Sequence, residues 1–90
     1  KDKRVLVSLE KHEFTLGRSP KADLMIEDFG VSRMHAKILR DAEGYSIVDL
    51  DSRNGTKVNN VPVKQAKFGK GDTISLGNFT LEVLESVADR

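Results

Sequence analysis

The sequence contains no cysteine and no tryptophan, and its aromatic residues are one tyrosine and four phenylalanines. Without cysteine, disulfide bonds and thiolate metal sites are excluded, and a reducing compartment is permitted. The two histidines, His12 and His35, lie far apart with no further ligand pattern, so we expect no metal site and no cofactor. The formal net charge is only +1, which predicts no strong attraction to nucleic acid or to a membrane surface.

Long apolar runs are also missing. No stretch approaches the roughly 20 residues that a membrane-spanning helix needs, and no signal-peptide pattern opens the chain. The Lys/Arg clusters at 1–4 and 64–70 lack interleaved aromatic residues, so they indicate solvated faces and no nucleic-acid site. We therefore expect a cytoplasmic domain, or a nuclear one if the source is a eukaryote.

The chain has the size and composition of one small globular domain. With 90 residues and 38% hydrophobic content, it can bury roughly two-thirds of its unfolded surface. It begins at Lys1 instead of Met, and both ends are highly charged. We expect residues 1–90 to be a single domain with its core at about 5–84, cut from a longer protein and monomeric in isolation.

Short apolar and β-branched runs recur along the chain, with turn signals about every 8 to 12 residues. This spacing predicts an all-β protein, an antiparallel β-sandwich of two sheets, in which any helix is short. Alternation predicts inward faces at Val5–Leu9 and at Phe79, Leu81 and Val83, and the turn at Gly69–Asp72 is expected to close a hairpin. The expected strands are Val5–Leu9, Phe14–Leu16, Leu24–Ile26, Ala36–Leu39, Tyr45–Leu50, Thr56–Val63, Ala66–Phe68, Thr73–Leu76 and Phe79–Leu84.

Three turn-rich loops each place an arginine next to a serine. The pairs are Arg18 and Ser19, Ser32 and Arg33, and Ser52 and Arg53. Guanidinium groups bind phosphate through two parallel hydrogen bonds and hydroxyls add donors, so three such loops at one end of a sandwich would hold an anion of charge about −2. Asn54 adds an amide and a carbonyl that suit an extended peptide backbone. On composition alone, the alternative that these are ordinary solvated arginines stays open.

Several motifs agree in order and spacing with a known family. They are Gly17-Arg18, Asp23-Leu24, Ile26-x-Asp28, Val31-Ser32-Arg33-x-His35-Ala36, Asp49-Leu50-x-Ser52-x-Asn54-Gly55-Thr56-x-Val58-Asn59, Gly71-Asp72-x-Ile74 and Gly77. Together they span about Val5 to Leu84 and closely resemble the forkhead-associated (FHA) domain.

The resemblance implies a sandwich of the SMAD/FHA type whose loops at one end bind phosphothreonine peptides. Such a domain is non-catalytic and recruits a partner phosphorylated by a Ser/Thr kinase. By position, the phosphate ligands are Arg18 and Ser32, with Arg33 and Arg53 as further contacts; Asn54 holds the peptide backbone; and Gly17, His35, Gly55 and Asn59 form the loop scaffold. A slot for the threonine methyl is expected near Asn54 and the Gly77-Asn78 turn.

Other functions fit the residues less well. A hydrolase using Ser32, His35 and Asp49 lacks a Gly-x-Ser-x-Gly elbow, so we expect no catalysis and a His35 imidazole that bonds loop backbone. Gly69-Lys70-Gly71-Asp72 lacks the nucleotide-binding pattern. The alternative that stays open is a binding module that works without phosphate, through another face of the sandwich.

Overall fold

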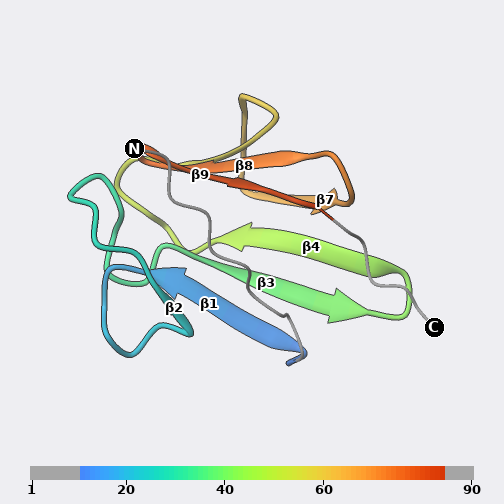
Figure 1. The fold of residues 1–90 in the computed structure, drawn as a ribbon, viewed down its shortest axis with the longest axis horizontal. Coiled ribbons are helices and arrows are strands. Elements are labelled where there is room, and N and C mark those ends of the chain that lie inside the picture. The colour runs from blue at the N-terminus through green and yellow to red at the C-terminus, as the bar shows by residue number, and fades with distance from the viewer. Residues whose placement is uncertain (1–10, 85–90) are drawn as a thin grey trace.

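The structure is a computed structural model that describes residues 11–84, and these residues form strands and no helix (Figure 1). The expected strand at Val5–Leu9 lies outside the described residues. The strands are β1 (Glu13–Gly17), β2 (Leu24–Met25), β3 (Ala36–Asp41), β4 (Gly44–Asp49), β5 (Thr56–Val58), β6 (Val61–Val63), β7 (Gln65–Phe68), β8 (Thr73–Leu76) and β9 (Phe79–Glu82).

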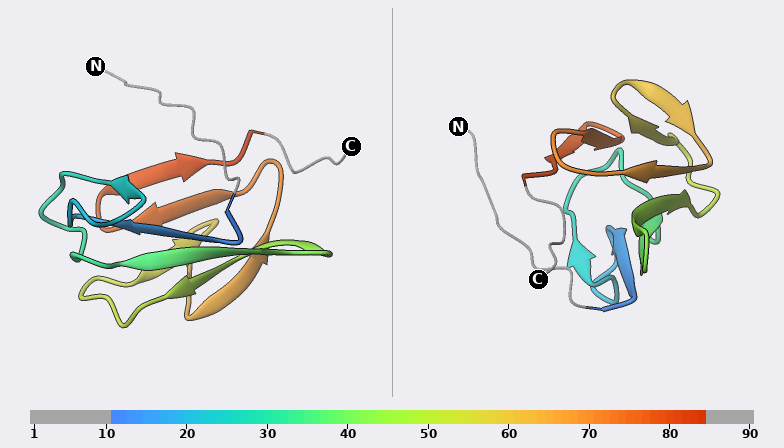
Figure 2. Two further views of the ribbon diagram at one scale, coloured as in Figure 1. Left: turned by 90° about the horizontal axis from the view of Figure 1, so that it is seen from below. Right: turned by 90° about the vertical axis from the view of Figure 1, so that its right-hand side faces the viewer.

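Two sheets stack as layers, which Figure 2 shows edge on. One sheet has five strands in the order β2-β1-β3-β4-β7, and the other has four in the order β6-β5-β8-β9. Every pairing is antiparallel apart from the short parallel pair of β1 and β2. The predicted antiparallel sandwich of two sheets is therefore confirmed.

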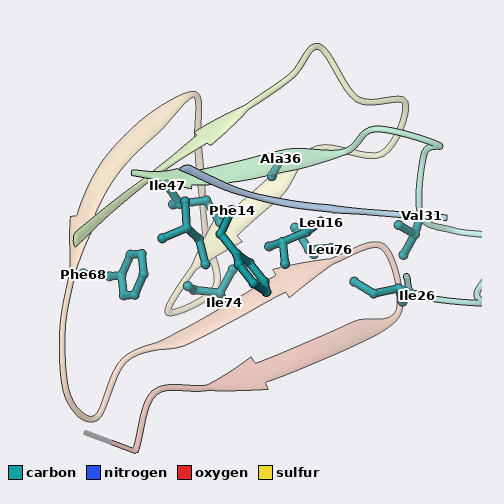
Figure 3. Close-up of a cluster of buried hydrophobic side chains, with 10 residues drawn as sticks. Phe14, Leu16, Ile26, Val31, Ala36, Ile47, Phe68, Ile74 and Leu76 are labelled. Carbon is teal, nitrogen blue, oxygen red and sulfur yellow. The ribbon is translucent and has the colours of Figure 1, made fainter. Parts of the chain in front are cut away.

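The core lies between the two layers and follows the period of two that strands impose (Figure 3). Phe14 and Leu16 of β1 face Ile74 and Leu76 of β8, while Ile47 of β4 is fully buried beside them. The predicted inward face of the last strand is also confirmed, because its apolar side chains are partly buried against this cluster. Those side chains are Phe79, Leu81 and Val83.

A two-residue turn divides the expected strand Thr56–Val63 into β5 and β6. Asn59 and Asn60 both have positive φ, 52° and 70°, as a type I′ hairpin requires. Pro62 fits in β6 because this is an edge strand, where a missing N–H costs no ladder hydrogen bond.

The prediction of a hairpin at Gly69–Asp72 is wrong. β7 belongs to the five-stranded sheet and β8 to the four-stranded sheet, so this turn carries the chain from one layer to the other. Its Asp72 carboxylate accepts a hydrogen bond from the Gly69 amide at 2.8 Å, which tightens the reversal locally. Glycine and aspartate predict such a reversal, but they do not indicate which strand the next segment pairs with.

The strand registers bring five strand termini to one end of the sandwich. Leu16 pairs with Ala36 and Ala36 with Asp49, so the end of β1, the start of β3 and the end of β4 are adjacent. Across the sandwich, Thr56 pairs with Leu76, which adds the start of β5 and the end of β8. The loops attached to these strands gather at the left of Figure 1.

Candidate functional site

The three loops with an Arg-Ser pair meet around Ser32. The Arg18 amide donates to the Ser32 carbonyl at 3.0 Å, and the Arg53 amide donates to the Ser32 hydroxyl oxygen at 2.9 Å. The Ser19 amide also donates to the Arg33 carbonyl at 3.0 Å. Because the Ser32 hydroxyl oxygen accepts this bond, its proton stays available to donate to a bound anion.

The approach of the first two loops depends on Gly17. A Cβ atom at this position would lie 2.0 Å from the Arg33 carbonyl oxygen and 3.0 Å from the Met34 Cα. Both neighbours are backbone atoms and cannot rotate aside. Glycine is therefore required here because any side chain would push the Arg18 and Ser32 loops apart.

The three loops at this junction carry three arginines, none of which has a carboxylate partner among residues 11–84. Arg18 is fixed by one bond from its Nε to the Val31 carbonyl at 2.9 Å, so its terminal N–H groups remain free to bind an anion. Arg33 and Arg53 are exposed and are positioned by their backbone atoms. Within residues 11–84, none of the three takes part in an ion pair. This end of the molecule is therefore rich in donors for an anion.

The His35 side chain links the loop that carries Ser32 to the loop that carries Gly55. Its side chain is fully buried; Nδ1 accepts from the Ser32 amide at 3.0 Å, and Nε2 lies 2.8 Å from the Gly55 carbonyl. These partners assign a neutral imidazole with its proton on Nε2. The expected imidazole that bonds loop backbone is thus present. Both nitrogens are occupied by main-chain groups, so His35 has none free to activate the Ser32 hydroxyl.

Asp49 organises the third loop, a role that the sequence reasoning missed. Its carboxylate accepts from the Ser52 amide at 3.0 Å, from the Ser52 hydroxyl at 2.6 Å and from the Thr56 hydroxyl at 2.7 Å. The Ser52 hydroxyl oxygen in turn accepts from the Gly55 amide at 2.9 Å. Burial raises the pKa of the Asp49 carboxyl, but the hydrogen bonds from Ser52 and Thr56 outweigh it and leave the pKa below its usual 3.8.

A comparison with protein-family models identifies the family of this chain. The model for the FHA domain matches residues 14–77. The chain belongs to the FHA domain family. FHA domains read phosphorylated motifs with arginine side chains, and the loop end described above carries the arginines.

Relatives and solved structures agree with this assignment. A curated protein called oxoglutarate dehydrogenase inhibitor, from Corynebacterium jeikeium, is 38% identical over 84% of this chain and 53% of its own length. The chain spans about half the length of such relatives. The FHA domain of FhaA, solved with the intracellular domain of Rv3910, is 38% identical with a TM-score of 0.78, covering 82% of this chain and 81% of that one. A structure from a study of phosphothreonine-dependent FHA domain interactions is 39% identical with a TM-score of 0.76, covering 80% of this chain and 75% of that one.

In this FHA domain Asn54 lies between the arginine-rich end and a groove. Its Nδ2 donates to the Gly30 carbonyl at 2.8 Å, while its side-chain carbonyl accepts no bond from a described residue. Gly77 packs so tightly on Gly30 that a Cβ there would lie 2.3 Å from the Gly30 oxygen. Asn54, Gly77 and Asn78, the residues predicted near the methyl slot, all line this groove.

Asn59 lies apart from the other predicted scaffold residues. It follows β5 at the end opposite Gly55, where its Nδ2 donates to Asp72 at 3.0 Å and its side-chain oxygen accepts from the Thr73 amide at 2.9 Å. Asn59 thus holds the connection between the two sheets, while Gly17, His35 and Gly55 contact the three loops around Ser32.

Residues 11–84 contain no group of three His, Asp or Glu side chains that could hold a metal ion. In the same range there is no helix of the length and apolar character needed to cross a membrane.

Proposed function

We propose that this FHA domain binds phosphothreonine in a partner protein phosphorylated by a Ser/Thr kinase, and that it does so without catalysis. One observation carries the proposal: the backbone amides of Arg18 and Arg53 both donate to Ser32, so the three arginine-bearing loops meet there, and their guanidinium groups have no carboxylate partner among residues 11–84. Loops that bring three arginines without carboxylate partners and the Ser32 hydroxyl to one end of the molecule are suited to a phosphate dianion.

The side chains divide the work between the phosphate and the peptide. Arg18 and Ser32 act as the principal phosphate ligands, because Arg18 is held by Val31 and the Ser32 hydroxyl proton is free to donate. Arg33 and Arg53 add charge from exposed positions. Asn54 holds the peptide main chain through its unbonded carbonyl.

The expected affinity is moderate. Each charge-assisted hydrogen bond contributes about 1.5–3 kcal/mol, while phosphate must lose much of its hydration on binding. We therefore expect micromolar binding of a short peptide, equivalent to about −8 kcal/mol. A threonine methyl adds only about 1 kcal/mol by burial, so a strong preference over phosphoserine would require the methyl to fix the phosphate rotamer as well.

Isothermal titration with a phosphothreonine peptide library tests the proposal, with unphosphorylated and phosphoserine copies as controls. The expected result is binding that needs the phosphate. Arg18→Ala should weaken it at least about 30-fold, since it removes charge-assisted bonds to the anion while the strands stay intact. Lys70→Ala, an exposed cation in the turn after β7, is the matched control and should bind like the parent.

The second candidate is partner binding without phosphate, through another face of the sandwich. Partner capture that survives Arg18→Ala with unchanged affinity would support this alternative and refute the phosphate site.

We further propose that residues 1–90 act as one FHA domain, monomeric in isolation, within a longer cytoplasmic or nuclear protein.

A further inference from the structure

A groove of about 450 Å³ opens beside Asn54 and follows the outer surface of β5 and β8. Lys57 lies on this surface, because its neighbours Thr56 and Val58 face the core and its cross-strand partner is Ser75. β5 is hydrogen-bonded on both sides, to β6 and to β8, so the backbone that carries Lys57 is fixed. The groove is therefore a preformed surface that begins at Asn54, the residue proposed to bind the peptide main chain.

The lining of the groove has an unusual composition. It consists of three glycines, three asparagines, one serine and Lys57, with no carboxylate and no apolar side chain. Amides and a hydroxyl can donate hydrogen bonds, and the lysine supplies the charge. Such a lining cannot stabilise an apolar anchor, which needs apolar contact area. It is suited to a small negatively charged side chain.

The Lys57 ammonium has no partner among the residues that the structure describes. Three lysines in the described part of the chain, Lys11, Lys37 and Lys67, pair with carboxylates. Lys57 makes no ion pair or hydrogen bond with any of residues 11–84, although it lies on a central strand and not in a loop. Its charge is thus available to a ligand in the groove.

We propose that Lys57 selects a phosphothreonine partner carrying an aspartate or glutamate near the phosphorylated residue. This rests on the proposed function, since Asn54 must first hold the peptide main chain at the head of the groove. Lys57 lies three positions after Asn54 in the chain, a span of at most about 11 Å. The acidic side chain therefore belongs within about four positions of the phosphothreonine, on the side that passes Asn54.

A phosphothreonine peptide library with aspartate, glutamate, asparagine or glutamine at each flanking position locates the preference. Isothermal titration then compares the best acidic peptide with its amide copy on the parent protein and on Lys57→Met. The parent should bind the acidic peptide about three- to fivefold more tightly, as a partly solvated ion pair allows, and Lys57→Met should lose that ratio. Lys57→Glu should invert it. Lys70→Met changes an exposed lysine outside the groove lining, so it is the matched control and should keep the ratio.

The outcomes separate this inference from the proposed function. If the parent binds phosphothreonine peptides but treats acidic and amide copies alike, the role of Lys57 is refuted and the phosphate site stands. If Lys57→Met keeps the acidic preference, another residue makes the selection and the inference is wrong. If the parent binds no phosphothreonine peptide at all, the proposed function fails and this inference fails with it. Thermal unfolding of each variant checks that the fold is retained.

Discussion

The two ends of the sandwich are built from similar turn residues, but their charged side chains differ in whether they have partners within the protein. At the end formed by the β3–β4 turn and the β7–β8 connection, Lys67 pairs with Glu43 at 2.7 Å, and Asp72 is bonded by Asn59 and the Gly69 amide. At the other end, three arginines surround Ser32 and none is in an ion pair with a described residue.

This difference shows how the fold separates stability from binding. At the binding end, hydrogen bonds of the backbone, His35 and Asp49 hold the loops, and the Arg18 guanidinium uses only its Nε–H within the protein, on the Val31 carbonyl. Burying or neutralising those charges internally would leave nothing for a phosphate to bind. Substitutions at matched positions of the two ends should therefore separate loss of binding from loss of stability.

The largest effect is expected from His35→Ala. Removing the fully buried ring leaves the Ser32 amide and the Gly55 carbonyl without partners, which should cost about 3 kcal/mol of unfolding free energy. Phosphopeptide binding should weaken as well, because two loops lose their link. The matched control is His12→Ala, an exposed histidine that should change stability by no more than about 0.5 kcal/mol. Urea unfolding measures both, and equal stability losses would contradict the assigned role of His35.

A smaller loss is expected from Gly17→Ala, at about 2 kcal/mol. The added Cβ would collide with the Arg33 carbonyl, so the chain must separate the Arg18 and Ser32 loops. Gly69→Ala is the control at the other end: no atom lies within 4 Å of a Cβ there, and stability should stay within about 0.5 kcal/mol. Thermal unfolding and peptide titration compare the pair. Unchanged binding by Gly17→Ala would mean that the close loop approach is not needed.

Much of the fold could be predicted from sequence because local signals determine it. Alternation and turn residues gave the strands, and a sandwich was confirmed. Which strands pair with one another was harder to predict from the sequence. Gly69–Asp72 has the composition of a hairpin turn, yet β7 and β8 lie in different sheets. A turn sequence sets a local reversal of the chain, whereas the choice of sheet depends on which faces are buried together.

The candidate site was predictable where side chains carry unusual chemistry for a turn. Arginine beside serine in three loops was such a signal, and the loops do meet. Asp49 was missed as the organiser of its loop because aspartate at the end of a strand is ordinary in sequence. An aspartate three residues before Ser52 was the available signal, since carboxylates commonly bond nearby amides and hydroxyls in turns.

The smallest effect on stability is expected from Asp49 and Asp72, two carboxylates at opposite ends of the sandwich whose roles can be compared directly. Hydrogen bonds hold the pKa of each carboxyl below its usual 3.8, against burial that raises it. Because the folded pKa lies below the unfolded one, each contributes stability that is present above the unfolded pKa and is lost as the pH falls through the folded pKa. Unfolding free energy should therefore decrease below about pH 4, and either Asp→Asn variant should flatten part of that decrease.

Binding at pH 7 tells the two carboxylates apart. Asp49→Asn would turn an amide N–H group toward the Ser52 donors and loosen the loop that carries Arg53 and Asn54, so affinity should fall about fivefold, and stability by about 1–2 kcal/mol. Asp72→Asn disturbs only the connection between the sheets at the other end and should leave affinity unchanged. If both variants reduced the affinity for the phosphopeptide equally, the two ends would be coupled through the sheets. Binding would then depend on the whole sandwich and not on the hydrogen bonds around one set of loops.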